Sequence, residues 1–304
     1  MLALSTSWCS STLSDGPALV AAVARHGVPG VELDYRIGAK TFGPMPAALK
    51  RAGLTVVSVH NFCPHPADMA RFSPSGDLLS LSDREKETRR RAVALSARTL
   101  EIAAELEAGV VVLHCGRVVM DPELPVWQRL FDTDQIRSER GREFAARKLA
   151  RRDRLKGPHL DALRFSLDTL LRLADRHGLR LGLENRAHFH ELPGPEDFAL
   201  LFGEFAGAPL GYWHDTGHAQ RHAALGICTP QSLLAANGKH LVGLHLHDAR
   251  GLTDHLPPGS GEIDFGALEA FLVPGIARVI ELAPGTPETD VAAGIRYCRE
   301  NGLA

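Results

Sequence analysis

Histidine or carboxylate side chains end six short apolar segments of this chain, and both residue types are common metal ligands. Each segment is rich in aliphatic residues, as in Val59-His60 and Leu183-Glu184. If the segments are neighbouring parallel strands, their carboxyl ends meet at one face, and the polar groups converge there. Converging buried carboxylates are costly without a counter-charge, which a divalent cation supplies. The pattern therefore predicts a metal site formed by His60, His114, Glu184, Asp215, His245 and Glu281.

The residues two positions before these candidate ligands indicate the same arrangement. Side chains two apart on a strand point to the same side, so these residues should face the interior together with the ligands. All are small or apolar and none is charged, which is typical of a packed layer beneath a polar mouth. They are Ser58, Val112, Gly182, Trp213, Gly243 and Val279.

Further histidines follow in the loops after the sixth and seventh segments. His218 belongs to DTGHA, and His255 precedes a Pro-Pro-Gly sequence that would fix its loop. For both histidines, metal ligation and a hydrogen bond to substrate are equally compatible with the sequence. His247 shares the parity of His245 and is predicted to contact a ligand residue or the substrate.

Strand-like and helical segments alternate from one end of the chain to the other. Residues 83–108 and 160–177 carry apolar side chains at three- and four-residue spacing, which is typical of helices facing a sheet. Strands separated by such helices predict a (β/α)8 TIM barrel, as a single domain over residues 1–304. An open, doubly wound sheet is the alternative, because the sequence does not show strand order. The predicted strands are Leu2–Trp8, Gly30–Leu33, Thr55–His60, Val110–His114, Arg180–Glu184, Leu210–Asp215, Leu241–His247 and Arg278–Leu282.

Two predicted connections are longer than the rest, over residues 64–83 and 117–158. Loops that follow the strands lie on the active-site face of such a barrel, so both are expected to cover the substrate. The second contains a charged stretch, ERGREFAARKLARRDRLK, which also fits a solvated helix stabilised by mixed charges. In the second strand, Glu32 and Asp34 are interpreted as structural hydrogen-bonding groups.

Composition limits the classes of protein to which the chain can belong. Its formal net charge of −2 gives no overall attraction to nucleic acid or to a membrane, so a small-molecule partner is expected. Five cysteines without CxxC spacing predict a reduced, cytoplasmic protein, and the first residues do not resemble a signal peptide. No apolar run is long enough for a membrane span. The sequence does not indicate an oligomeric state.

The motifs together resemble the xylose isomerase-like TIM-barrel superfamily, which contains sugar isomerases and epimerases as well as type IV apurinic endonucleases. The resemblance covers nearly the whole chain. The pieces that carry it are LENR (183–186), DTGHA (215–219), HLHD (245–248), HLPPGSGEIDF (255–265) and VIEL (279–282).

The two branches of this superfamily imply different metal sites. The isomerase and epimerase branch implies one divalent ion, Mn or Zn, held by Glu184, Asp215, His245 and Glu281. The endonuclease branch implies three zinc ions and adds the positions of His60, His114, His218, an aspartate and His255.

The chain departs from both branches. The aspartate expected two residues before His255 is Thr253, and Asp254 stands one residue later. In extended chain a one-residue shift reverses the side-chain direction, which argues against a complete third metal site. Arg186 stands where aldose isomerases carry a lysine after the strand-five glutamate, and arginine cannot act as a base.

Three functions are compatible with these residues. The first is a metal-dependent isomerase or epimerase of a sugar, sugar phosphate or related polyol, in which Glu184 and Glu281 exchange a proton with substrate carbon. The second is a hydrolase of phosphodiesters with two or three metals, in which Glu184 bridges a pair. The third is a binding protein without turnover. Residues predicted to contact the substrate are Arg186, His188, Trp213, His247 and Arg250.

Overall fold

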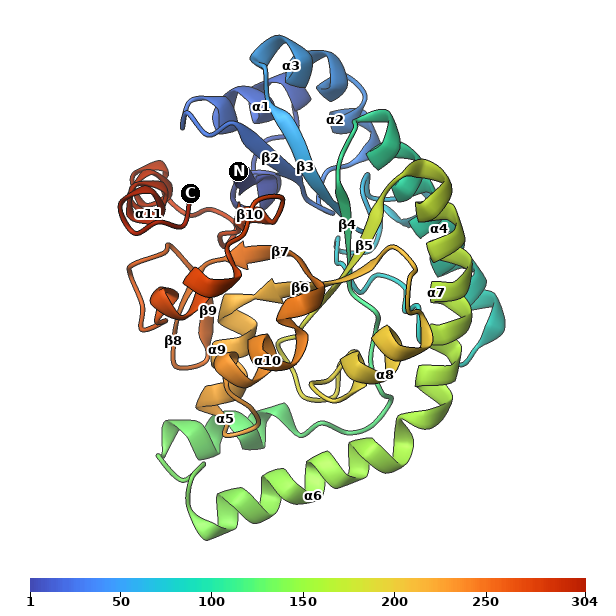
Figure 1. The fold of residues 1–304 in the computed structure, drawn as a ribbon, viewed down its shortest axis with the longest axis vertical. Helices are drawn as coiled ribbons and strands as arrows, with labels where there is room; N and C mark the ends of the chain where they lie inside the picture. Colours follow the sequence, from blue (N-terminus) through green and yellow to red (C-terminus); the bar gives the residue numbers. More distant parts are fainter.

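The computed structural model describes residues 1–304 and places eight parallel strands in a closed barrel (Figure 1). The first strand pairs with the second on one side and with the last on the other, which closes the ring. The predicted (β/α)8 barrel is confirmed, and this closure excludes the open, doubly wound sheet. In barrel order the strands are β1 (Leu2–Ser5), β10 (Ala277–Ile280), β7 (Leu241–Leu246), β6 (Leu210–Asp215), β5 (Arg180–Glu184), β4 (Val110–Leu113), β3 (Thr55–His60) and β2 (Gly30–Leu33).

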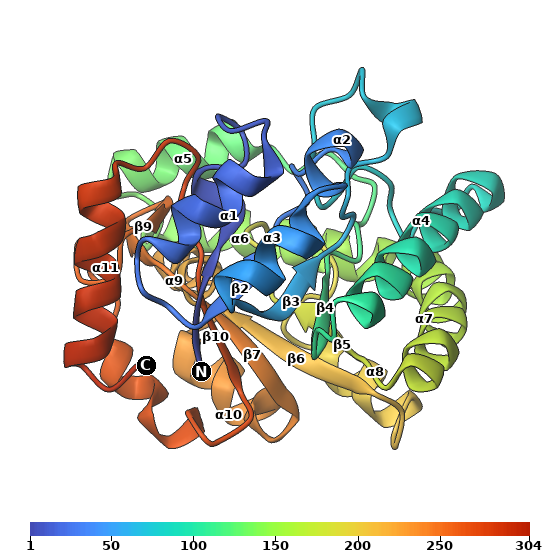
Figure 2. The same ribbon diagram turned by 90° about the horizontal axis from the view of Figure 1, so that it is seen from above.

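Helices surround the barrel and bury their apolar faces against it (Figure 1, Figure 2). α4 and α7 correspond to the helices predicted over 83–108 and 160–177, and they pack side by side. Gly53 after α3 and Gly178 after α7 have φ of 65° and 67°, a left-handed conformation that ends a helix at little cost in glycine. The barrel helices are α1 (Gly16–Ala24), α2 (Ala39–Phe42), α3 (Met45–Ala52), α4 (Lys86–Glu105), α7 (Gly157–His177), α8 (Asp197–Glu204), α9 (Thr216–Ala224), α10 (Pro230–Asn237) and α11 (Glu288–Glu300).

Four strands end earlier than the sequence predicted. The largest difference is in β1, which was expected to reach Trp8 but ends at Ser5. The Ser5 hydroxyl accepts a hydrogen bond from the Ser7 amide at 3.3 Å, and the chain turns there into a short 3-10 helix, Thr6–Trp8. β4, β7 and β10 also end before the predicted residue, because the chain leaves the sheet at the mouth.

A single indole ring fills much of the barrel interior beneath the mouth. Trp213 is fully buried among small and aliphatic side chains of the neighbouring strands. A Cβ on Gly243 would lie 2.1 Å from this ring, and one on Gly182 would lie 3.2 Å from it. The two glycines of the predicted interior layer therefore make room for the tryptophan, and the barrel has a solid floor on which the site rests.

The two long connections take different forms. The one after β3 runs over residues 61–85 with only a short 3-10 helix, Ala67–Met69. The one after β4 contains α5 (Leu124–Asp132) and α6 (Glu139–Leu155), which cross below α8 and α9 in Figure 1. Its apolar side chains, including Trp127 and Phe144, form a cluster of their own against the β5 and α9 loops. The charged stretch is thus a helix with one buried face and a solvated face.

An antiparallel hairpin of β8 (Asp248–Arg250) and β9 (Thr253–Leu256) follows β7 and stands outside the barrel. The buried carboxylate of Asp248 fixes the end of this hairpin. It accepts hydrogen bonds from the amides of Gly259, Gly261 and Ile263 at 2.8 to 3.0 Å. None of the helices is both long and apolar enough to cross a membrane.

We expect Gly243→Ala to lower the free energy of unfolding by about 2–3 kcal/mol, because the new methyl group overlaps the Trp213 ring. Gly203→Ala is the matched control, since Gly203 lies in α8 with open space around it; it should be neutral or raise stability by up to about 1 kcal/mol. Denaturant unfolding of both metal-free variants measures the difference. Equal stability of the two variants would contradict the role given to the indole.

Candidate metal centre

The candidate ligands lie together at the carboxyl ends of the barrel strands. Three of them are the last residues of β3, β5 and β6, one lies next to the end of β7, and two directly follow β4 and β10. Because all eight strands run in parallel, these ends meet at one mouth. All six predicted strand-end residues are brought together there: His60, His114, Glu184, Asp215, His245 and Glu281.

Three carboxylates surround one ring nitrogen of His245. Its Nδ1 lies 3.1 Å from Glu281 Oε2, 3.4 Å from Glu184 Oε1 and 3.6 Å from Asp215 Oδ2. The four residues are buried, and one ligand atom from each lies within 4.8 Å of the others. Nδ1 is buried without a hydrogen-bond partner, and so is Oε2 of Glu184. This donor set, three oxygens and one imidazole nitrogen, fits a divalent cation.

The carboxylates of this group are ionised in spite of their burial. Burial opposes ionisation of Glu184, but the histidines around it, foremost His114, hold its pKa well below the usual range. Burial likewise opposes ionisation of Glu281, and His245 holds the pKa of that carboxyl low. Burial lowers the pKa of His245, yet Glu281 and Glu32 raise it well above its usual value. Histidine protons thus balance the carboxylates, and a bound cation would replace those protons.

Glu32, on β2, fixes the orientation of His245. Both carboxylate oxygens of Glu32 lie 3.1 Å from His245 Nε2, and the Ser58 hydroxyl donates to Glu32 at 2.7 Å. When Nε2–H is donated to Glu32, Nδ1 keeps its lone pair for a cation. The interpretation of Glu32 as a structural group was therefore too narrow. Asp34 fits that interpretation, since it pairs with Arg36 at 2.7 Å.

A second group shares Glu184 with the first. His114 Nε2 lies 2.8 Å and His60 Nε2 3.4 Å from Glu184 Oε2, and the three ligand atoms lie within 4.8 Å of one another. The other ring nitrogen of His114 contacts Asp77 at 3.2 Å. Burial lowers the pKa of His114, but Glu184 and Asp77 together raise it to about 9. The group offers two imidazole nitrogens and one carboxylate oxygen to a cation.

A third group lies on the hairpin side of the mouth. The ligand atoms of His218, Asp254 and His255 lie within 4.8 Å of one another, and His255 Nδ1 is 3.1 Å from Asp254 Oδ1. The expectation that Asp254 would point away was wrong. His255 has a left-handed φ of 57°, so the chain is not extended there and neighbouring side chains turn to the same side. The shift from Thr253 to Asp254 is compensated by this backbone turn.

His247 connects the hairpin with the first group. Its Nε2 lies 2.9 Å from Asp215 Oδ2, and its Nδ1 accepts a hydrogen bond from the His255 amide at 2.8 Å. It also belongs to a fourth, overlapping set of ligand atoms with Asp215, His255 and Glu281. The predicted contact of His247 with a ligand residue is therefore present in the structure.

A family model described as xylose isomerase-like TIM barrel matches residues 20–301 of the sequence. The chain belongs to this family. Membership fixes the architecture and leaves the reaction to the residues of the mouth, because one fold can carry several functions.

Solved structures with the same fold are similar to this xylose isomerase-like barrel over almost its whole length. A D-tagatose 3-epimerase-like protein has a TM-score of 0.69 and 19% identity, covering 99% of this chain and 97% of its own. The 3-keto-D-glucoside 4-epimerase of E. coli has a TM-score of 0.69 and 17% identity, covering 98% of both chains. An L-ribulose 3-epimerase has a TM-score of 0.69 and 14% identity, covering 99% and 94%.

In sequence, an uncharacterized protein of Methanocaldococcus jannaschii is 28% identical over 204 residues, which are 66% of this chain. The match spans 58% of that relative's length.

The residues predicted to contact substrate lie at different depths in the structure. Arg186 is buried beside Glu184, with its Nη1 3.6 Å from Glu184 Oε2. His188 is half-buried on the loop after β5, where its amide donates to Glu191 at 2.7 Å. Trp213, by contrast, lies under His245 with the ring centroids 5.1 Å apart, and it is fully buried. The indole therefore supports a candidate ligand from below and does not form a wall for the substrate.

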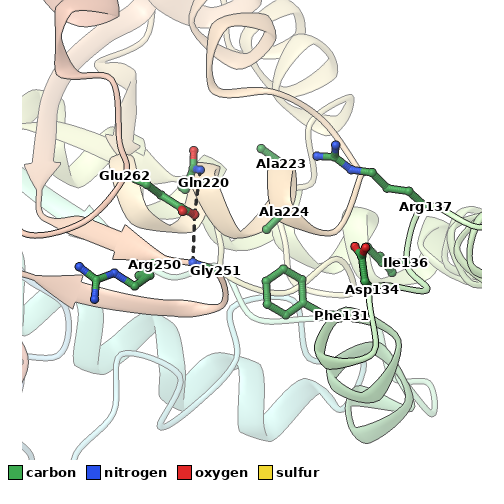
Figure 3. Close-up of a pocket in the computed structure, with 10 residues that line it drawn as sticks. All are labelled: Phe131, Asp134, Ile136, Arg137, Gln220, Ala223, Ala224, Arg250, Gly251 and Glu262. Carbon is green, nitrogen blue, oxygen red and sulfur yellow. Dashed lines mark hydrogen bonds between the residues drawn. The ribbon is translucent and has the colours of Figure 1, made fainter.

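Arg250 lies outside the mouth. The turn of the hairpin carries it to the surface, where its guanidinium donates to the Ser260 carbonyl at 2.8 Å. It lines an outer cavity of about 780 Å³ together with Gln220, Ala223 and Ala224 of α9 (Figure 3). These α9 residues lie on the helix face opposite to His218, so the helix separates this cavity from the candidate ligands. The structure thus places Arg250, which was predicted to contact substrate, away from the candidate ligands.

Two residues of the mouth were missed by sequence reasoning. Asp77 reaches it from the long connection after β3, where no periodicity fixes side-chain direction. Asn185 directly follows Glu184 in sequence and contacts Asp215 in space. Its side chain donates to the Asp215 carbonyl at 2.9 Å and accepts from the Asp215 amide at 2.8 Å. The carbonyl of Asn185 also lies 3.0 Å from His218 Nδ1. Its place directly after Glu184 was the only signal in the sequence.

We expect Glu184→Gln to lose at least one bound metal ion per chain, because this carboxylate takes part in both of the first two groups. The neutral amide keeps the shape but removes the charge that attracts the cation. Elemental analysis of the purified, dialysed variant measures the loss. Glu101→Gln, on the exposed side of α4, is the control and should keep its metal. Full metal content in Glu184→Gln would refute the assignment of this residue as a ligand.

Proposed function

We propose that this chain is a metal-dependent isomerase or epimerase acting on a sugar, sugar phosphate or related polyol. The observation that carries the proposal is the set Glu184, Asp215, His245 and Glu281, in which two glutamates from distant strands flank the same histidine nitrogen. The names of the solved structures with this fold, D-tagatose 3-epimerase-like protein, 3-keto-D-glucoside 4-epimerase and L-ribulose 3-epimerase, support the same class of substrate.

The chemistry follows from where the two glutamates stand. A divalent ion at this set, Mn or Zn, would act as a Lewis acid that stabilises negative charge on the carbonyl and hydroxyl oxygens of the substrate. Glu184 ends β5 and Glu281 follows β10, and β6 and β7 lie between these strands. One carboxylate therefore reaches a substrate carbon from one side and the second from the other.

Proton transfer by this pair is balanced. The C–H bond next to the carbonyl breaks, its proton moves to one glutamate, and the electron pair moves onto the carbonyl oxygen. The other glutamate must enter the step protonated, with a proton taken from solvent, and it donates that proton to carbon. Protonation of the opposite face of the same carbon restores the carbonyl and is epimerisation. For isomerisation, the hydroxyl proton of the neighbouring carbon also moves to the former carbonyl oxygen, so that protonation at the former carbonyl carbon leaves a new carbonyl on its neighbour.

The cysteines and the net charge support a cellular compartment and a class of substrate for the proposed enzyme. All five cysteines are free thiols, and four of them are buried. This fits a reducing compartment, so we place the protein in the cytoplasm. Together with the net charge of −2, the burial of the ligands in a narrow mouth favours a small-molecule substrate over nucleic acid.

A second candidate function is hydrolysis of a phosphoester by two or three metal ions. It is favoured by the two further ligand groups, one around His60 and His114 and one around His218, Asp254 and His255. Two metals that share Glu184 would hold both the attacking water and the leaving oxygen of such a reaction.

Glu281→Gln separates the two chemistries. If the glutamate is a base toward carbon, the variant should stop incorporation of solvent deuterium into substrate, by at least about a hundredfold, even with its metal restored. Proton NMR in heavy water measures this against a panel of ketoses, sugar phosphates and phosphodiesters. Glu300→Gln, exposed at the end of α11, is the control. Phosphoester cleavage without any carbon-bound exchange in the unaltered protein would overturn the isomerase proposal in favour of the hydrolase.

His60→Ala and His114→Ala test the number of metals. For a one-metal isomerase these histidines contact substrate, so each variant should keep the metal content of the unaltered chain while KM rises. Elemental analysis beside steady-state kinetics reads both quantities. Loss of one metal equivalent in each variant would instead identify a second ion and support hydrolysis.

A further inference from the structure

The guanidinium of Arg186 has donors that no protein group accepts. Its Nη2 donates to Asp77 at 2.7 Å and contacts Glu191 at 3.4 Å, but Nη1 and Nε are buried without a hydrogen-bond partner. The Arg186 side chain is only 5% exposed, so water does not freely supply the missing acceptors. Leaving buried N–H groups unpaired costs about 1–3 kcal/mol for each group. A ligand oxygen in the mouth is the natural acceptor.

Asp77 supplies the complementary group beside these donors. Its Oδ2 contacts both Arg186 Nη2 and His114 Nδ1, whereas Oδ1 takes part in neither contact. The Asp77 side chain is one-quarter exposed. Free donors on Arg186 and a free acceptor on Asp77 therefore lie next to each other. A hydroxyl group, which both donates and accepts, can satisfy the two at once.

The charges around these groups disfavour an anion. Arg186 faces three carboxylates, Asp77, Glu184 and Glu191, so its positive charge is more than matched. The other two guanidiniums that contact carboxylates at the mouth are matched in the same way: Arg36 with Asp34 at 2.7 Å and Arg221 with Asp254 at 3.5 Å. Arg117 stands on the rim but is exposed to solvent. None of these three guanidiniums is therefore left without a carboxylate partner to attract a phosphate.

An aromatic ring lies on the same side of the mouth. Tyr35, on the loop after β2, meets His60 edge to face, with centroids 5.0 Å apart and an angle of 71°. Its ring centroid is 6.4 Å from that of His114. The ring is partly exposed and offers an apolar surface to the C–H groups of a ligand held by Arg186 and Asp77.

We infer that Arg186 and Asp77 bind hydroxyl groups of an uncharged polyol, with Tyr35 against its carbon chain, and that the substrate at this position carries no phosphate. This inference rests on the proposed function and narrows its substrate class to unphosphorylated sugars and their relatives. The two recognition residues come from the loop after β5 and from the connection after β3.

The test is direct binding to the metal-loaded protein, measured by calorimetry with xylitol and with inorganic phosphate as probes. Xylitol should bind the unaltered protein more tightly than phosphate does. Asp77→Asn keeps the shape but removes the acceptor charge, so xylitol binding should weaken about tenfold, the loss expected for one charge-assisted hydrogen bond. Phosphate binding to the same variant should become severalfold tighter, because a nearby negative charge is gone.

Asp68→Asn is the matched control. Asp68 lies in the same connection, exposed and paired with Arg91, and this variant should leave both dissociation constants unchanged. Tighter binding of phosphate than of xylitol to the unaltered protein, no binding of xylitol, or identical behaviour of the Asp77 and Asp68 variants would each overturn the inference. Because no turnover is measured, these outcomes are independent of the exchange experiment on Glu281, which tests the reaction itself.

Discussion

Three buried carboxylates share the space around one histidine nitrogen, and most of the other features of the mouth depend on this concentration of charge. Glu184, Asp215 and Glu281 all lie within 3.6 Å of His245 Nδ1. Ionised groups taken out of water are stable only when an opposite charge is close. The neighbouring histidines supply it, because these carboxylates raise the pKa of His114, His218 and His245. A divalent cation provides it more strongly and leaves the histidines neutral, as ligands must be.

The barrel keeps these three carboxylates and His245 in fixed positions. Trp213 fills the interior under His245, and Gly182 and Gly243 accommodate it, so the ligand layer cannot sink into the barrel. Sideways movement is limited by Asn185, whose amide group binds both the N–H and the C=O of Asp215. That clamp couples the ends of β5 and β6, which carry two of the carboxylates. The rigid strands therefore keep these carboxylates close together although their charges repel one another.

The sequence predicted this part of the site well because it lies on strands. On a strand, parity fixes the side on which a residue points, and the strand end fixes its depth; this was sufficient to group residues as distant as His60 and Glu281. Parity also predicts that Glu32 points inward, because it pairs in register with the inward-facing Ser58. Its contact with His245 could not be predicted, because the sequence does not show that the ends of β2 and β7 approach each other at the mouth. For Trp213, parity correctly predicted both the inward direction and the place in the layer beneath the mouth, and this buried position argues against the predicted contact with substrate.

Loop residues could not be predicted in the same way. The contact of Asp77 with Arg186 joins positions more than a hundred residues apart through a connection without regular structure. The approach of Asp254 to His218 depends on one left-handed backbone angle at His255, a conformation that is uncommon outside glycine and that no neighbouring residue signals. Arg250 was misplaced for the converse reason, since the hairpin turn at Gly251 directs it outward. In each case the deciding quantity is a loop conformation set by distant packing.

Whether the mouth can bind one metal ion or several depends partly on Arg186, whose contact with Asp77 the sequence did not predict. The group of His60, His114 and Glu184 has a single carboxylate, shared with the first group, and the Arg186 guanidinium lies 3.6 Å from its Oε2. That guanidinium is itself neutralised by Asp77 at 2.7 Å and Glu191 at 3.4 Å, so the number of carboxylates in each group decides which group attracts a cation more strongly. The group of Glu184, Asp215, His245 and Glu281 has three carboxylates and no such guanidinium contact with its other members. A first cation would therefore bind more strongly on the side of His245, where three carboxylates surround it, than at the group that has only the shared Glu184.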